Sequence, residues 1–246
     1  MVLLFLLIRF RSGQPGNQSW LIAGWWGILG LIGWGYLVTA VTWLIFRDSI
    51  IKTILVTVFF FILNVLSGLH LLGFLDPVSP VLGILLEGNV PFIVLTGMVA
   101  GLIIRKIPAA ETKKLLLTFI SIGILSIAAG FFLRNWFIIS KIYATPSWGM
   151  ICNGISFLVF ILIYWIADVR NRIRWASFVK PAGQHSLTTY LAPDILYHLI
   201  WMSGIPILIY KQSTEPVVVV LGSIVWALLM VGLTAVLARL NIRLKL

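Results

Sequence analysis

The stretch LLLTFISIGILSIAAGFFL, residues 115–133, decides the fold class of this 246-residue chain. It carries no charged side chain over its whole length, and its apolar residues are continuous, without the alternation of a half-buried strand. A helix of about 20 such residues crosses the roughly 30 Å hydrocarbon core of a bilayer. The stretch therefore predicts a transmembrane helix and argues against a transmembrane β-barrel.

Similar apolar runs recur along the chain. Together they predict an all-α polytopic transmembrane helix bundle with about seven full spans, short loops and a single domain over residues 1–246. The predicted spans are residues 20–46, 53–75, 81–104, 115–133, 146–167, 185–210 and 217–237.

The first eight residues form another apolar run, followed by Arg9 and Arg11. Eight helical residues rise only about 12 Å, which is too short to span a bilayer. A signal peptide would carry its positive charge before the apolar run. We expect a truncated N-terminal helix here, in a chain that is the C-terminal part of a longer architecture.

Composition supports the membrane assignment. Hydrophobic residues make up 61% of the chain and charged residues only 10%, whereas soluble domains contain about 25% charged residues. The net charge of +11 is expected to be topogenic, not a nucleic-acid surface. A cytoplasmic C-terminus places thirteen of the eighteen basic residues inside and five outside. The single cysteine, Cys152, excludes an internal disulfide, and we predict no metal site.

The predicted sixth span concentrates polar groups at membrane depth. Asp194 and His198 are four residues apart and share a helix face, while Pro193 frees the carbonyl of Thr189. The functional interpretation is a catalytic pair that faces the bundle interior, in which Asp194 orients His198 and His198 acts as a base. The alternative is a buried structural pair.

A second polar group lies toward the predicted outer side. An outer cavity is expected to be lined by His70, Glu87, Asn89, Asn135 and Lys141, and the alternative is simple contact with water and headgroups. The segment 88–91 predicts a helix break, with Asn89 as the cap of the helix that follows. Thr145 and Pro146 predict the next outer helix start, as N-cap and first residue.

The predicted cytoplasmic loop before the sixth span is basic. It contains Arg170, Arg172, Arg174 and Lys180, and the span then begins at His185. One interpretation is a phosphate clamp for a CoA thioester beside a helix N-terminus. The other is positive-inside topology with contact to anionic lipid.

Two stretches, residues 140–168 and 175–190, resemble bacterial members of the heparan-alpha-glucosaminide N-acetyltransferase family. In the first, the matching residues are Lys141, Thr145, Ser147, Gly154, Tyr164, Trp165 and Asp168. In the second, they are Gly183, Leu187 and Tyr190, while His185 and Ser186 stand where the family has Asn and Ala.

The resemblance implies acetyl transfer from cytoplasmic acetyl-CoA to a sugar amine across the membrane. Independently of the resemblance, the outer helix start at residues 145–148, which includes Ser147, lies beside Lys141 and is predicted to suit an acidic sugar. The family's N-terminal helices, its Leu-Asp-x-x-Arg-Gly start and its expected acyl-handling histidine have no counterpart in the sequence, so that role is carried over to no residue here.

The sequence therefore predicts a bacterial inner-membrane acyltransferase, with acetyl-CoA as co-substrate and a glycan amine or hydroxyl as acceptor. The alternatives are a membrane transporter, with Asp194 and His198 as coupling groups, and an inactive fragment. The bilayer is the predicted partner, nucleic acid is not, and a homo-oligomer is left open.

Overall fold

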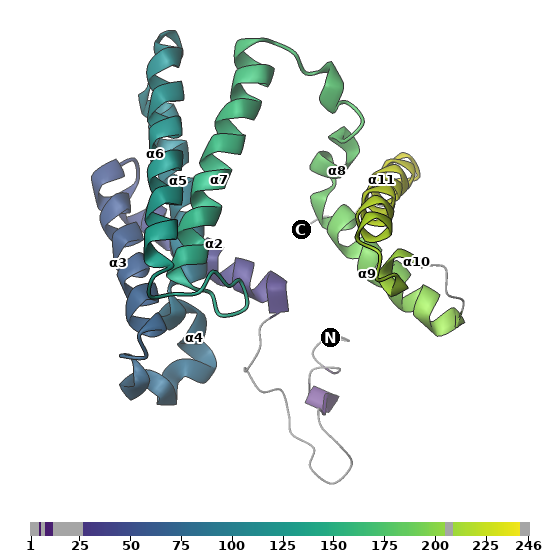
Figure 1. The fold of residues 1–246 in the computed structure, drawn as a ribbon, viewed down its shortest axis with the longest axis horizontal. Helices are drawn as coiled ribbons and strands as arrows, with labels where there is room; N and C mark the ends of the chain where they lie inside the picture. The colour runs from purple at the N-terminus through teal and green to yellow at the C-terminus, as the bar shows by residue number, and fades with distance from the viewer. Residues whose placement is uncertain (1–4, 6–7, 12–26, 205–208, 242–246) are drawn as a thin grey trace. The chain divides into compact units, whose positions relative to one another are not determined.

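The computed structural model describes residues 5, 8–11, 27–204 and 209–241, and this part of the chain contains helices and turns but no strand (Figure 1). The chain forms two compact units, Met1–Trp165 and Ile166–Leu246. The predicted truncated helix at residues 1–8 falls largely outside the described residues, as does the start of the predicted first span. A single domain over the whole chain stays a prediction.

Six helices in the described residues are long and apolar enough to cross a membrane. This confirms an all-α polytopic membrane protein. They are α2 (Gly27–Phe46), α3 (Ile50–Gly68), α5 (Asn89–Lys106), α6 (Thr112–Leu133), α7 (Pro146–Tyr164) with the π-helical turn Trp165–Val169, and α11 (Pro216–Arg239).

The spanning helices carry large apolar side chains on their outer surface. Ile45 is 64% exposed, Leu117 65% and Leu125 68%. In water, exposing this apolar surface would cost about 25 cal/mol for each Å². In a bilayer the same side chains contact lipid, which agrees with the predicted environment.

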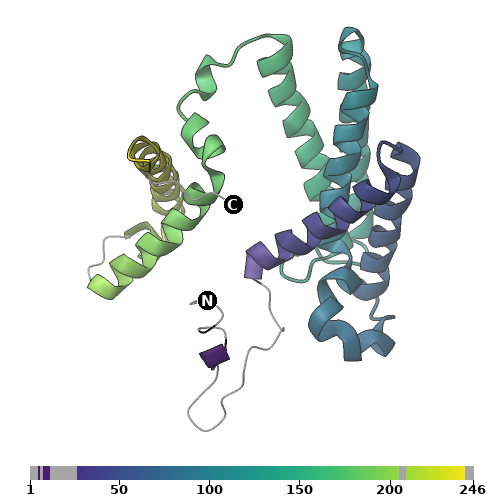
Figure 2. The ribbon, with the colours of Figure 1, turned by 180° about the vertical axis from the view of Figure 1, so that it is seen from behind.

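The first unit contains α2 to α7. The helices α6 and α7 pack so closely that a Cβ on Gly154 would lie only 2.6 Å from the carbonyl oxygen of Gly123. Phe119 and Phe157 meet beside this crossing in an edge-on arrangement, with ring centroids 5.3 Å apart. Figure 2 shows α2 inclined across the unit, and Gly35 lets it approach Val94 of α5.

The predicted third span, residues 81–104, is divided at Gly88, as the sequence indicates. A 3₁₀ segment, η1 (Gly73–Val78), leads into the short helix α4 (Ser79–Glu87), and α5 starts at Asn89. Gly88 has φ +70°, and a Cβ there would lie 2.3 Å from the carbonyl oxygen of Phe60. Only glycine fits both the left-handed backbone and this contact.

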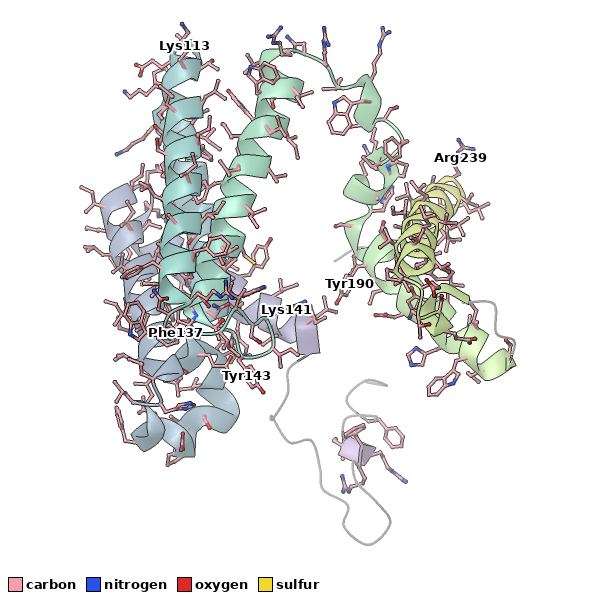
Figure 3. All side chains as sticks on the ribbon, viewed as in Figure 1. Lys113, Phe137, Lys141, Tyr143, Tyr190 and Arg239 are labelled. Atoms are coloured by element: carbon pink, nitrogen blue, oxygen red, sulfur yellow. The ribbon has the colours of Figure 1, made fainter. Side chains whose placement is uncertain are left out.

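Charged residues of the first unit gather at the two ends of its helices. At one end Asp48 accepts a 2.7 Å ion-pair contact from Arg105, and Glu111 one of 2.8 Å from Lys114. Figure 3 shows Lys113 at this end of α6, with Lys141 and Tyr143 beyond its other end. Which of the two ends is cytoplasmic stays a prediction.

The second unit consists of η4 (Arg174–Ala176), α8 (Lys180–Gln184), α9 (Ser186–Ser203), α10 (Ile209–Gln212) and α11. The hydroxyls of Thr189 and Thr234 lie 3.1 Å apart and join α9 to α11. Tyr197 stacks on Trp226 with a distance of 4.9 Å between the ring centroids. The Lys211 ammonium lies over the Tyr197 ring, 3.2 Å from its centroid.

The structure differs from the prediction at the sixth span, residues 185–210. This segment forms α9, an 18-residue helix that is not among the six helices apolar enough to be candidate spans. Asp194, His198 and two threonines lower its hydropathy. Residues 205–208 lie outside the described part.

Candidate functional site

An open cavity of about 410 Å³ lies where α3, η1 and α4 meet in the first unit. Its lining includes two of the predicted acceptor residues, His70 and Glu87, and a third titratable residue, Asp76, that the sequence analysis did not single out. The lining residues are Ser67, His70, Leu72, Gly73, Asp76, Ser79, Gly83, Leu86 and Glu87.

Small and polar residues recur along this segment at helical spacing. His70, Gly73, Asp76 and Ser79 are three apart, which matches the period of a 3₁₀ helix, and Gly83 and Glu87 continue at the four-residue spacing of an α-helix. The stripe faces the cavity. This spacing is the sequence signal that identifies Asp76 as a cavity residue.

Local backbone chemistry fixes the middle of the stripe. The hydroxyl of Ser79 donates to the carbonyl oxygen of Asp76 over 2.8 Å at the junction of η1 and α4. His70 adopts a left-handed backbone, with φ 57°, directly after α3 ends. The cavity wall therefore runs from Ser67 in the last turn of α3, through the turn at His70, into η1 and α4.

Glu87 is the last residue of α4 and lies outside the six candidate spans. Glu87 is an exposed residue, but partial burial of its carboxyl group raises its pKa, because desolvation disfavours the charged form. A carboxyl group with a raised pKa exchanges protons closer to neutral pH.

Within the described residues, no group of three or more His, Cys, Asp and Glu side chains is arranged to hold a metal ion.

A buried amide network lies directly behind the cavity wall. The Asn64 side chain donates to the carbonyl oxygens of Glu87 and Ala144, each over 2.8 Å. Asn89 donates to the Asn64 side-chain oxygen over 3.2 Å and to the Thr145 carbonyl over 3.3 Å. These bonds connect α3, the α4–α5 break and the start of α7.

The network orients the Asn89 amide. Its nitrogen lies between two acceptor oxygens, so the reversed amide would place oxygen against oxygen. The Asn89 side-chain oxygen is buried and has no hydrogen-bond partner among the described residues. The prediction that Asn89 caps α5 is wrong, because Gly88 occupies the N-cap position and Asn89 is the first helical residue.

The start of α7 extends the network to the loop that precedes it. Thr145 holds the predicted N-cap position, but its hydroxyl bonds to the Ser140 carbonyl at 3.2 Å and lies 3.3 Å from the Ser147 hydroxyl. Ser147 is fully buried and donates to the Ile138 carbonyl over 2.8 Å. Lys141 is exposed in the turn between them.

The predicted acceptor residues are thus divided among three environments. His70 and Glu87 line the cavity, Asn89 and Ser147 are buried in hydrogen-bonded packing, and Lys141 is exposed in a turn. The structure gives Asn89 and Ser147 a packing role, while their predicted contact with substrate stays a prediction.

Asp194 and His198 lie on one face of α9, and within the second unit both are exposed. His198 Nδ1 lies 2.8 Å from the main-chain carbonyl oxygen of Asp194. A carbonyl only accepts, so Nδ1 carries the proton and Nε2 has the lone pair of the neutral ring. Asp194 thus positions His198 through its main chain, where the sequence analysis expected its carboxylate.

The basic loop is exposed as well. Arg170, Arg172, Arg174 and Lys180 all present their side chains to the outside of the second unit, and His185 is half-buried at the N-terminal boundary of α9. Guanidinium groups in such a segment have the chemistry to bind phosphate. The predicted CoA contacts remain a prediction.

A second cavity, of about 350 Å³, lies among α5, α6 and α7 and is mainly apolar. Its polar lining residues are Thr96, Asn153 and Ser156, and the Asn153 side chain donates to the Thr96 hydroxyl over 3.2 Å.

Comparison with known protein families, curated proteins and solved structures found no match to this chain.

Proposed function

We propose that the protein is a membrane acyltransferase that moves an acetyl group from acetyl-CoA to an amine or hydroxyl acceptor, and that the acceptor binds in the cavity of His70 and Glu87. One observation carries the proposal. The cavity brings together two residues that the sequence places on the acceptor side and adds a third titratable group, Asp76. An imidazole and two carboxyl groups are suited to hydrogen bonds with an amine or a sugar hydroxyl.

The proposed reaction is nucleophilic substitution at a thioester. The acceptor nitrogen or oxygen forms a bond to the acetyl carbonyl carbon, and the carbon–sulfur bond breaks. The proton lost by the acceptor passes to a base, and the CoA sulfur leaves as a thiolate that takes up a proton. The base stays the sequence prediction His198, whose Nδ1 lies 2.8 Å from the Asp194 carbonyl oxygen within the second unit.

The donor side is proposed at the basic loop of the second unit. The guanidinium groups of Arg170, Arg172 and Arg174 would pair with the CoA phosphates, assisted by Lys180 and His185. Supporting features are the exposure of all four basic side chains and the predicted cytoplasmic side of this loop.

Activity can be measured on the full chain in vesicles, with acetyl-labelled CoA and glucosamine as the trial acceptor. The proposal expects labelled product and one released thiol for each acetyl group transferred. The pair His70→Gln and Glu87→Gln should raise KM for the acceptor and leave acetyl-CoA binding unchanged. Equal acceptor KM in wild type and both variants would overturn the cavity assignment, and no transfer with any amine or hydroxyl acceptor would overturn the reaction.

The donor site has its own test. Calorimetry should detect acetyl-CoA binding to wild type and at least tenfold weaker binding after Arg170, Arg172 and Arg174 are replaced together by Gln, through the loss of charge-assisted bonds. The control replaces Lys113 and Lys114 by Gln, which removes charge from a different loop. Equal binding by wild type and the triple variant would exclude this loop as the donor site.

A second candidate function is transport of a small polar solute. The observation that favours it is the break between α4 and α5 at Gly88, since discontinuous helices form solute sites in many transporters. Vesicles separate the two functions. A transporter accumulates unmodified labelled solute without acetyl-CoA, whereas an acyltransferase consumes acetyl-CoA and releases an acetylated product.

A further inference from the structure

The segment from Leu71 to Glu87 has two chemically distinct faces. The cavity stripe occupies one face, whereas the other carries exposed apolar side chains. Phe74 is 76% exposed, Leu71 58% and Val81 52%. Exposed apolar residues on an amphipathic segment of a membrane protein are typical of a segment that lies in the interface plane.

The position of the segment in the chain supports this placement. It joins the end of α3 at Gly68 to the start of α5 at Asn89, and both helices are candidate spans. The nine residues of α4 rise about 13.5 Å, less than half of the hydrocarbon thickness. Figure 1 shows α4 beyond the end of α3. The helix α4 is therefore too short to cross the bilayer by itself.

The charge of the cavity indicates what it binds. Its lining contains the carboxyl groups of Asp76 and Glu87 and the imidazole of His70, and none of its nine lining residues is Lys or Arg. Carboxylates are acceptors that complement an ammonium group. Because the apolar face of the same segment contacts lipid, a headgroup in the cavity can keep its acyl chains in the bilayer.

We propose that η1 and α4 lie in the lipid–water interface and that the cavity binds the ammonium headgroup of a membrane lipid. This inference names a second ligand for the cavity in which the proposed acceptor binds, so a bound headgroup and the acceptor would compete for it. It concerns binding alone, so every measurement below omits acetyl-CoA, and its failure leaves the transfer proposal to be judged by its own assay.

The first experiment measures depth. In a Cys152→Ser background, a spin label is attached to Phe74→Cys on the apolar face or to Ser79→Cys on the cavity face of the full chain in vesicles. Collision with oxygen, which concentrates in lipid, should dominate at position 74, and collision with a water-soluble nickel chelate at position 79. A nickel response at position 74 equal to that at position 79 would overturn the interfacial placement.

The second experiment measures headgroup preference by native mass spectrometry of the full chain. The probes are phosphatidylethanolamine, phosphatidylcholine and phosphatidylglycerol with identical acyl chains. A primary ammonium donates hydrogen bonds that a trimethylammonium lacks. Wild type should therefore bind phosphatidylethanolamine at least about fivefold more tightly than phosphatidylcholine, which is the effect of one net hydrogen bond.

The double variant Asp76→Asn, Glu87→Gln should lose this preference. The control variant, Asp168→Asn, Glu215→Gln, removes two exposed carboxylates of the second unit and should keep it. Equal binding of all three lipids to wild type would overturn the headgroup assignment, as would a preference that survives in the double variant.

Discussion

Gly149 at the start of α7 lies directly against the side chain of Asn89 at the start of α5. A Cβ atom on residue 149 would be 2.7 Å from the Asn89 amide nitrogen. The amide is held by its bonds to Asn64 and Thr145, so it cannot move aside without breaking them. The crossing of α5 and α7 is thus set by a glycine in contact with an immobilised polar side chain.

Gly149→Ala should therefore destabilise the protein by about 1–3 kcal/mol, the usual cost of overpacking. Thermal unfolding in a mild detergent measures the loss. The matched control is Gly97→Ala in α5, because nothing lies within 4 Å of a Cβ at that site. Alanine is the better helix former, so the control should be neutral or slightly stabilised. Equal loss in both variants would contradict the contact.

Asn64→Ala should be costly for a different reason. It removes the donor to two carbonyl oxygens, of Glu87 and Ala144, and the acceptor for Asn89. Each buried group left without a partner costs about 1–3 kcal/mol. Asn135→Ala changes an amide of the same type at an exposed position and should leave the unfolding temperature within a degree or two of wild type. A wild-type unfolding temperature in Asn64→Ala would show that the network contributes no stability.

The raised pKa of Glu87 predicts a pH dependence with a defined sign. The folded state binds the Glu87 proton more tightly than the unfolded state, so stability is greatest below the ordinary carboxyl pKa and falls as pH rises through the folded pKa. Glu87→Gln should reduce this fall between pH 4 and pH 7. The control, Glu215→Gln, changes an exposed carboxylate and should leave the wild-type curve unchanged. Identical curves for wild type and Glu87→Gln would contradict the assignment.

Whether α9 crosses the membrane decides the side of the C-terminus. Eighteen helical residues rise about 27 Å, close to the hydrocarbon thickness. If α9 spans, reporters fused after Gln184 and after Asn241 lie on one side and a reporter after Gln212 lies on the other. We expect this pattern, with the C-terminus cytoplasmic. A reporter after Gln212 on the same side as one after Gln184 would mean that α9 lies along the membrane surface and that the C-terminus is outside.

The spanning helices were predictable because a bilayer demands long uninterrupted apolar runs, and residues 115–133 meet that demand without any tertiary information. The break at Gly88 was predictable from Gly88, Asn89 and Pro91 alone. The role of Asn89 was not, because an asparagine after a glycine has the same local signature whether it caps a helix or binds Asn64 across the bundle. The place of Asp76 in the cavity was not predictable for a related reason. The three-residue spacing of Gly73, Asp76 and Ser79 has a meaning only once the segment is known to be a 3₁₀ helix.

The left-handed break at Gly88 has a geometric consequence for the whole first unit. Gly88 contacts the main chain of α3 at Phe60 and Asn64, so the cavity wall is attached to α3 at a fixed number of turns from the Asp48–Arg105 end. The nineteen residues of α3 correspond to about 28 Å. The length of this one helix therefore sets the depth of the cavity relative to the opposite membrane surface. Inserting one full turn into α3 before Phe60 would displace the cavity outward by about 5 Å while leaving its own residues unchanged.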